Sequence, residues 1–127
     1  MDVREGLRYS KDHEWVEMRG TVARVGITDY AQDALGDVVF VQLPDVGRAV
    51  AASEGCSEVE STKSVSDIYA PVAGTVAAVN ARLGAEPHLL NADPYGEGWL
   101  LLVRPTATGE IQELMAAEDY RRKVEGA

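Results

Sequence analysis

Short apolar runs of strand length, separated by turns that contain glycine or proline, fill most of the chain and constrain it to a mainly β fold. Residues 14–18 and 22–27 flank a glycine turn, a pattern that predicts a β-hairpin. Residues 99–103 form an unbroken apolar run, which is typical of a buried strand. Because a chain of 127 residues suits one core, we expect a single domain over residues 1–127 with its core over about residues 7–104.

Two segments carry helix signals instead. Thr28 is a candidate N-cap for a short helix over residues 29–35. Asp29 places negative charge in the first turn, where the helix dipole favours it, and Gly36 suits the position that ends a helix. Residues 109–124 predict a C-terminal helical segment.

The middle of the chain predicts a second hairpin with a lysine at its tip. Residues 57–61 and 65–70 are its two predicted arms, and Lys63 lies between them. Lys63 is the one cation in a stretch that has acids on both sides, among them Glu60 and Asp67. An isolated amine at the tip of a β-turn suits covalent loading better than charge pairing, although an ordinary surface lysine is the alternative.

The charge balance of the chain excludes several classes of function. The sequence has 12 basic and 21 acidic residues, which gives a formal net charge of −9 at pH 7. A nucleic-acid-binding protein needs a basic face, and an anionic membrane would repel this chain, so we expect neither partner. The surplus of acid favours docking onto basic surfaces of other proteins.

Cysteine and histidine usage argues against a disulfide framework, a metal site and an enzyme. Cys56 is the single cysteine, so no internal disulfide can form, and a reducing compartment is expected. With His13 and His88 it could form a zinc site only if several carboxylates joined. The sequence has no nucleophile–base pair or phosphate-binding glycine loop, so we expect no catalytic residues and no metal. We also find no signal peptide and no apolar run long enough to span a membrane, and we expect a cytoplasmic protein.

Several motifs lie in order along the chain, at residues 9–15, 25–32, 35–44, 59–67, 69–71 and 91–99. In this order and at this spacing they resemble the motifs of the glycine cleavage system H proteins, a family of lipoyl-lysine carriers. The run from Val59 to Asp67 differs from biotin carriers, which usually present Met-Lys-Met at this turn, and from 2-oxo acid dehydrogenase lipoyl domains, which usually present Asp-Lys-Ala. The resemblance implies a lipoyl/biotinyl-type sandwich of two antiparallel sheets, a barrel-sandwich hybrid, with a short helix after residue 28 and a C-terminal helical segment.

The resemblance also implies a function for Lys63, which matches the family's lipoylated lysine and would carry lipoate in amide linkage. In that family the lipoyl group takes up an aminomethyl group from glycine decarboxylase (P protein) and delivers it to an aminomethyltransferase (T protein). Dihydrolipoamide dehydrogenase (L protein) then reoxidises the lipoyl group. A lipoyl or octanoyl transferase or a lipoate ligase attaches the lipoyl group to the carrier. We therefore expect a non-catalytic carrier that is monomeric when free.

Four further residues are candidates for supporting roles, each with a structural alternative. Glu60 and Asp67 could be recognised by the lipoylating enzyme, or could belong to a solvated hairpin surface. A groove that limits access of water to the loaded arm would be lined by residues such as His13 and Asp29, or by the loop over residues 91–99. The alternatives are a hydrogen-bonded strand histidine and a helix-capping aspartate.

The chain departs from the family pattern at Ser53, Cys56, Ser57 and Ala81. These departures affect the strand before the lysine and the charge of any cleft, but they leave the run from Glu60 to Asp67 intact. They keep open a second function, that of an H-like carrier that relays lipoyl or octanoyl groups in protein lipoylation. An unmodified binding module or an enzyme is a third possibility.

Overall fold

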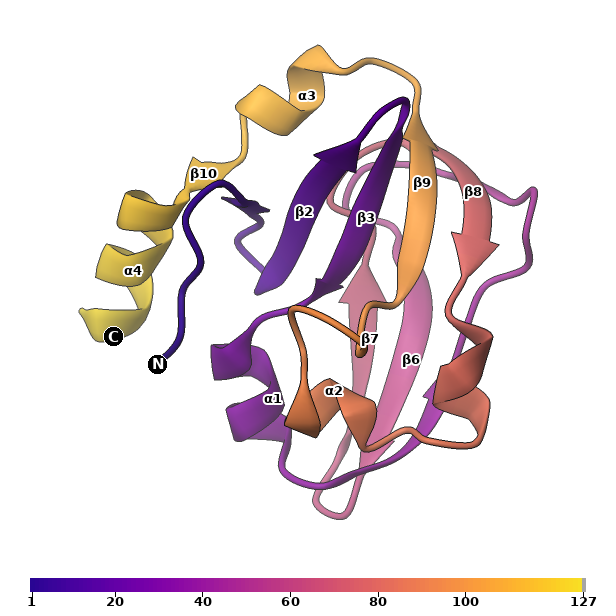
Figure 1. The fold of residues 1–127 in the computed structure, drawn as a ribbon, viewed down its shortest axis with the longest axis vertical. Coiled ribbons are helices and arrows are strands. Elements are labelled where there is room, and N and C mark those ends of the chain that lie inside the picture. Colours follow the sequence, from indigo (N-terminus) through magenta and orange to yellow (C-terminus); the bar gives the residue numbers. More distant parts are fainter. Residues whose placement is uncertain (127) are drawn as a thin grey trace.

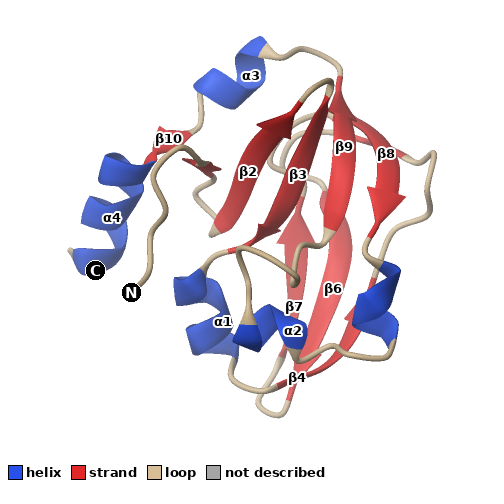
Figure 2. Cartoon of the chain, viewed as in Figure 1, coloured by secondary structure: helices blue, strands red, loops and turns tan. Residues whose placement is uncertain are grey.

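The computed structural model describes residues 1–126 and contains two antiparallel sheets bordered by short helices (Figures 1 and 2). The seven-stranded sheet has the spatial order β10 (Met115–Ala116), β1 (Arg8–Tyr9), β2 (Glu14–Arg19), β3 (Val22–Ile27), β9 (Leu101–Pro105), β8 (Gly74–Val79) and β5 (Ala49–Val50). The three-stranded sheet has the order β4 (Val38–Gln42), β6 (Gly55–Ser61) and β7 (Val65–Tyr69). The helices are α1 (Asp29–Leu35), a short 3₁₀ helix (Ala81–Gly84), α2 (Leu89–Ala92), α3 (Gly109–Gln112) and α4 (Ala117–Glu125).

The two sheets share one apolar core. Val25 and Val103 of the seven-stranded sheet belong to the same buried cluster as Val59 and Ile68 of the three-stranded sheet. Burial of each such side chain stabilises the fold by about 1.5–3 kcal/mol. Two antiparallel sheets around a common interior confirm the predicted mainly β sandwich.

A second, aromatic cluster lies beneath the C-terminal helix. Tyr9, Trp15 and Tyr120 are almost completely buried, and the rings of Tyr9 and Tyr120 stack with their centroids 4.5 Å apart. The predicted C-terminal helical segment is present, but β10 divides it into α3 and α4. β10 forms because its two residues pair with β1, which is distant in sequence, so local patterns gave no sign of it.

Helix α1 begins and ends as predicted. The Oγ1 of Thr28 accepts a hydrogen bond from the backbone N–H of Ala31 at 3.2 Å, which makes Thr28 the N-cap. Gly36 follows the last helical residue with a φ of +80°. Strand β9 starts at Leu101 and not at Trp99, because the N–H of Trp99 bonds within its own loop, to the carbonyl of Gly96.

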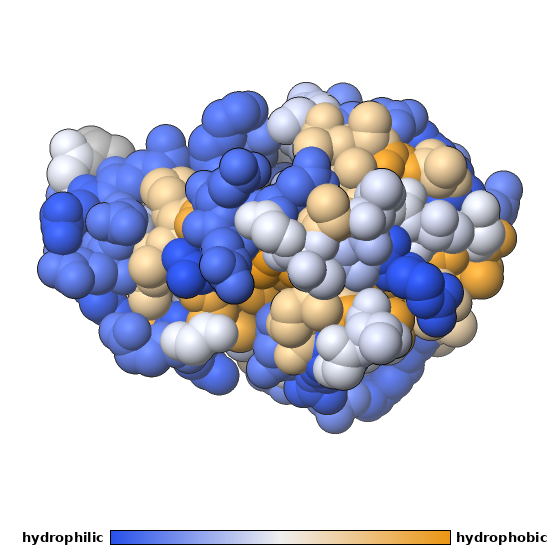
Figure 3. All heavy atoms as spheres, turned by 90° about the horizontal axis from the view of Figure 1, so that it is seen from above, coloured by the Kyte–Doolittle hydropathy of each residue, from blue (hydrophilic) through white to orange (hydrophobic). Residues whose placement is uncertain are grey.

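The loop between β6 and β7 lies at the bottom of Figure 1, at one end of the molecule. Figure 3 views the opposite end, where apolar side chains are interleaved with hydrophilic ones. Among the helices of residues 1–126, none has both the length and the apolar character that a membrane span requires.

Candidate functional site

The predicted hairpin around Lys63 is present, formed by β6 and β7. The backbone N–H of Ser61 donates to the carbonyl of Ser64 at 2.8 Å, which closes the turn and leaves Thr62 and Lys63 at its tip. The Oγ of Ser61 also accepts from the N–H of Lys63 at 3.2 Å and of Ser64 at 3.1 Å. Lys63 is exposed on a backbone that these hydrogen bonds hold in place.

The hairpin tip rests on the turn that joins α1 to β4. The N–H of Thr62 donates to the carbonyl of Asp37 at 3.0 Å. The side chain of Lys63 crosses Gly36 so closely that a Cβ built there would lie 2.8 Å from the lysine Cε. Position 36 therefore favours glycine for its positive φ, whereas the flexible lysine side chain could move away from a Cβ.

Asn91, near the end of α2, holds the turn between α1 and β4 through both the Nδ2 and the Oδ1 of its side-chain amide. Its Nδ2 donates to the carbonyl of Gly36 at 2.8 Å and to Oε1 of Gln32 at 3.1 Å. Its Oδ1 accepts from the N–H of Val38 at 2.9 Å. The sequence placed Asn91 only in a loop, because nothing local indicates a contact with residues so far away in the chain.

A groove of about 230 Å³ runs beside the hairpin, between α1 and β7. Ala31 and Ala34 form part of its helical wall, and Ser66 and Asp67 form part of its strand wall. His13, in the turn before β2, lines the same groove. The groove is therefore partly apolar and partly polar. It adjoins Lys63, because Ser64, the next residue in the chain, is part of its lining.

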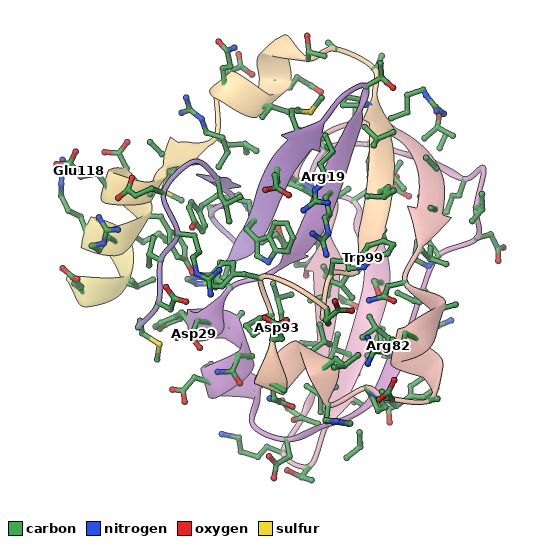
Figure 4. All side chains as sticks on the ribbon, in the orientation of Figure 1. Arg19, Asp29, Arg82, Asp93, Trp99 and Glu118 are labelled. Carbon is green, nitrogen blue, oxygen red and sulfur yellow. The ribbon has the colours of Figure 1, made fainter. Side chains whose placement is uncertain are left out.

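The structure brings two of the predicted supporting residues, His13 and Asp67, into this groove, and it places the other two elsewhere. Glu60 is half-buried on β6, directly opposite Val65. Asp29 lies at the N-terminal end of α1, where its carboxylate accepts from the N–H of Asp2 at 2.8 Å and from the amide of Gln32 at 2.9 Å (Figure 4). The hydrogen bond from the backbone N–H of Asp2 is the main cause that lowers the pKa of Asp29. Asp29 is thus an acid in the first turn of α1, and it is not part of the groove lining.

His13 has an uncommon backbone conformation and aromatic neighbours. Its φ is 68°, in the left-handed region, and its ring stacks on Tyr30 with the centroids 4.6 Å apart. Its Nδ1 hydrogen-bonds to the hydroxyl of Tyr120 at 2.8 Å, and that hydroxyl bonds to Oγ1 of Thr28 at 2.7 Å. Burial, with a smaller contribution from Lys123, lowers the pKa of His13, so its imidazole is neutral near pH 7.

Glu14 is a buried carboxyl group that links the two sheets. It is 1% exposed, on β2, and accepts hydrogen bonds from Oγ of Ser10 at 2.5 Å and from the N–H of Tyr69 on β7 at 3.3 Å. Burial raises its pKa to about 7, despite these hydrogen bonds, which favour the charged form. The sequence did not indicate its burial, because acids are seldom buried without a cationic partner.

Replacement of Glu14 by glutamine is expected to reduce the pH dependence of stability. The folded-state pKa of about 7 exceeds the ordinary value of 4.5, so the folded state binds more protons between these values than the unfolded state. The wild-type free energy of unfolding should fall by roughly 3 kcal/mol as pH rises through this window. Urea unfolding at pH 5.5 and pH 8 covers about 2 kcal/mol of this change, which Glu14→Gln should lose and Glu17→Gln, on the same strand, should retain. An unchanged difference in Glu14→Gln would contradict this account of the buried carboxyl.

Comparison with known proteins identifies close relatives over nearly the whole chain. The family model described as "Glycine cleavage H-protein" matches residues 7–127. A glycine cleavage system H protein of Thermus thermophilus is 52% identical over 125 residues, which cover 98% of both chains. A probable glycine cleavage system H protein of Haloarcula marismortui is 54% identical over 124 residues, again 98% of both chains. The crystal structure of a glycine cleavage system H protein from Mycobacterium marinum superposes with a TM-score of 0.87 at 45% identity, covering 98% of this chain and all of that one.

Proposed function

This chain belongs to the glycine cleavage H-protein family, whose members are the lipoyl shuttles of the glycine cleavage system, and we propose that it carries its lipoyl group in amide linkage on Lys63. The observation that supports Lys63 is its place at the exposed tip of the β6–β7 hairpin, on a backbone held by Ser61. An amine presented in this way is accessible to a modifying enzyme and is free to carry a long arm.

The proposed partners are those that handle such an arm. Glycine decarboxylase (P protein), an aminomethyltransferase (T protein) and dihydrolipoamide dehydrogenase (L protein) would each receive it, and a lipoyl or octanoyl transferase or a lipoate ligase would attach it. When bound, the lipoyl group supplies the sulfur chemistry that takes up the aminomethyl group and is later reoxidised. The chain itself holds and presents the arm and catalyses no step. Glu60 and Asp67 give the hairpin the negative charge that a basic enzyme surface would recognise.

The groove beside β7 fits the arm in length. A strand covers about 13 Å from Ser64 to Ile68, and both residues line the groove. A lysine side chain extended by a lipoyl chain reaches on the order of 14 Å from its Cα with standard bond lengths. We therefore place the stowed arm along this groove.

The groove also fits the arm in chemistry. Ala31 and Ala34 offer apolar surface to the hydrocarbon chain, and the carboxylates of Asp12 and Asp67 lie in the same lining. A protonated amine on the loaded arm would be attracted by these carboxylates. His13, neutral near pH 7, would not repel it. Enclosure in the groove limits access of water to the loaded group.

Incubation of the lipoylated protein with glycine and glycine decarboxylase tests this function. We expect a glycine-dependent aminomethyl mass increase on the protein. If none forms, and a transferase instead moves the acyl group from this chain to a separate lipoyl domain, the chain is a lipoyl-relay carrier and the proposal is wrong.

The same loaded protein tests the groove. Ala34→Phe, which fills the groove, should shorten the lifetime of the aminomethyl group several-fold, because the arm can no longer be stowed. Asp33→Phe places the same ring at an exposed position of α1 outside the groove lining and should keep the wild-type lifetime. Equal lifetimes for the wild type and Ala34→Phe would remove the groove from the proposal.

A further inference from the structure

A β-bulge in β4 exposes two consecutive apolar side chains. Val38 pairs with Ser61, but the next partner on β4 is Phe40, opposite Glu60, so Val39 is the extra residue. Val39 is 53% exposed and Phe40 is 50% exposed. A regular strand would turn one of the two inward, and bulges commonly redirect side chains in this way.

A third apolar side chain completes the patch beside the hairpin tip. Glu60 pairs with Phe40 on one side and with Val65 on the other, so the three share one row on the outer face of the small sheet. Val65 is 58% exposed. Val39, Phe40 and Val65, called the hairpin patch from here on, thus border the loop that carries Lys63.

The surroundings of the hairpin patch are acidic. The next outer row across the sheet contains Glu58 and Asp67, which pair with each other. The sequences of α1, β4, β6 and β7 contain no basic residue. The cations beside them are Lys63 in the loop and Arg48, which donates to the carbonyl of Gly55 at the start of β6 and lines a hollow with Glu58 and Asp67. A surface that complements the patch therefore has apolar groups facing Phe40 and Val65 and basic groups facing Glu60, which lies between them, and the acidic row beyond.

The hairpin patch and the arm groove are neighbouring surfaces with different linings. None of the three patch residues lines the groove, but Ser64 and Ser66, on either side of Val65, do, and Asp67 belongs both to the groove lining and to the acidic row beside the patch.

We propose that the hairpin patch is the docking surface for the enzyme that acylates Lys63, and that this enzyme presents an apolar pocket with basic residues around it. This inference rests on the proposed function. The acylating enzyme must bind before any arm exists, so its contacts are confined to the protein surface around the lysine. Exposed charge pairs contribute little on their own, and buried apolar anchors supply most of the affinity of an interface.

The test measures the initial rate of Lys63 acylation of the unmodified protein by a lipoate ligase with lipoate and ATP, followed by intact mass. Phe40→Thr and Val65→Thr each place threonine, a residue that favours strands, in the strand and should each lower kcat/KM about tenfold, as loss of an interface anchor does. Val46→Thr is the matched control, because Val46 is 61% exposed and lies outside the patch. It should react at the wild-type rate. Higher ionic strength should slow the wild type, because salt screens the acidic rim.

Patch variants that are acylated as fast as the wild type would overturn this inference and leave the role of Lys63 intact. Variants that keep the wild-type rate but dissociate a dimer would also overturn it, since a second copy would then cover the patch. If the wild type itself is never acylated at Lys63, the proposed function fails instead. Far-ultraviolet circular dichroism of each variant confirms that the fold is retained.

Discussion

Replacement of Lys63 by arginine is expected to abolish acylation of the protein and leave its fold intact. The guanidinium group keeps the positive charge but does not form the amide that holds the cofactor. The hydrogen bonds that close the hairpin use the backbone and Ser61, not the lysine side chain, so the free energy of unfolding should change by less than about 0.5 kcal/mol. Intact mass after incubation with a lipoate ligase, and urea unfolding of the same sample, measure both effects.

Lys11 offers a matched control for this substitution. Its side chain is 72% exposed, outside the hairpin, and Lys11→Arg should be acylated to the same extent as the wild type. Acylation of Lys63→Arg would show that another amine accepts the cofactor, and equal loss in both variants would show that the effect is not specific to the hairpin.

Replacement of Asn91 by alanine is expected to destabilise the protein by about 2–3 kcal/mol and to loosen the hairpin tip. The substitution leaves the carbonyl of Gly36 and the N–H of Val38 without their partner, and both are in a partly buried turn. Unsatisfied groups of this kind cost about 1–3 kcal/mol each, less where water reaches them. Urea unfolding gives the change in stability. Hydrogen exchange should be faster at Thr62, whose N–H bonds to Asp37 in the same turn.

Gln32→Ala is the control for Asn91. It removes one of the three hydrogen bonds of Asn91, the one to the side-chain oxygen of Gln32, and should cost about 1 kcal/mol or less. If Asn91→Ala costs no more than Gln32→Ala, or if exchange at Thr62 does not change, Asn91 does not support the hairpin as described.

The elements that the sequence predicted well are those with local signals. The hairpin of β2 and β3 follows from alternation around a glycine turn. Helix α1 follows from the cap at Thr28 and the glycine at position 36. The β6–β7 hairpin, with Lys63 at its tip, follows from two strand-like arms of similar length.

The features that the sequence missed depend on distant contacts. The bulge at Val39 depends on its pairing with β6, and the strand β10 exists only because β1 lies beside it. The hydrogen bonds of Asn91 to the turn after α1, and the hydrogen bond from Tyr69 to the buried Glu14, join segments more than fifty residues apart. For the same reason the sequence could name His13 and Asp29 as groove candidates but could not tell that only His13 lies there.

These contacts combine to place one amine on a supported tip. The turn at Gly36 carries the hairpin, Asn91 holds the turn, and the groove along β7 begins where the loop of Lys63 ends. A carrier needs such an arrangement, because the arm must be held firmly at its root while its far end moves between partners.

Peptide mapping of the native protein by mass spectrometry tests the central proposal most directly. It should find one lipoyl group, on the peptide that contains Lys63, and unmodified lysine at every other position. A biotinyl group on Lys63, or a lipoyl group on any other lysine, would contradict the account.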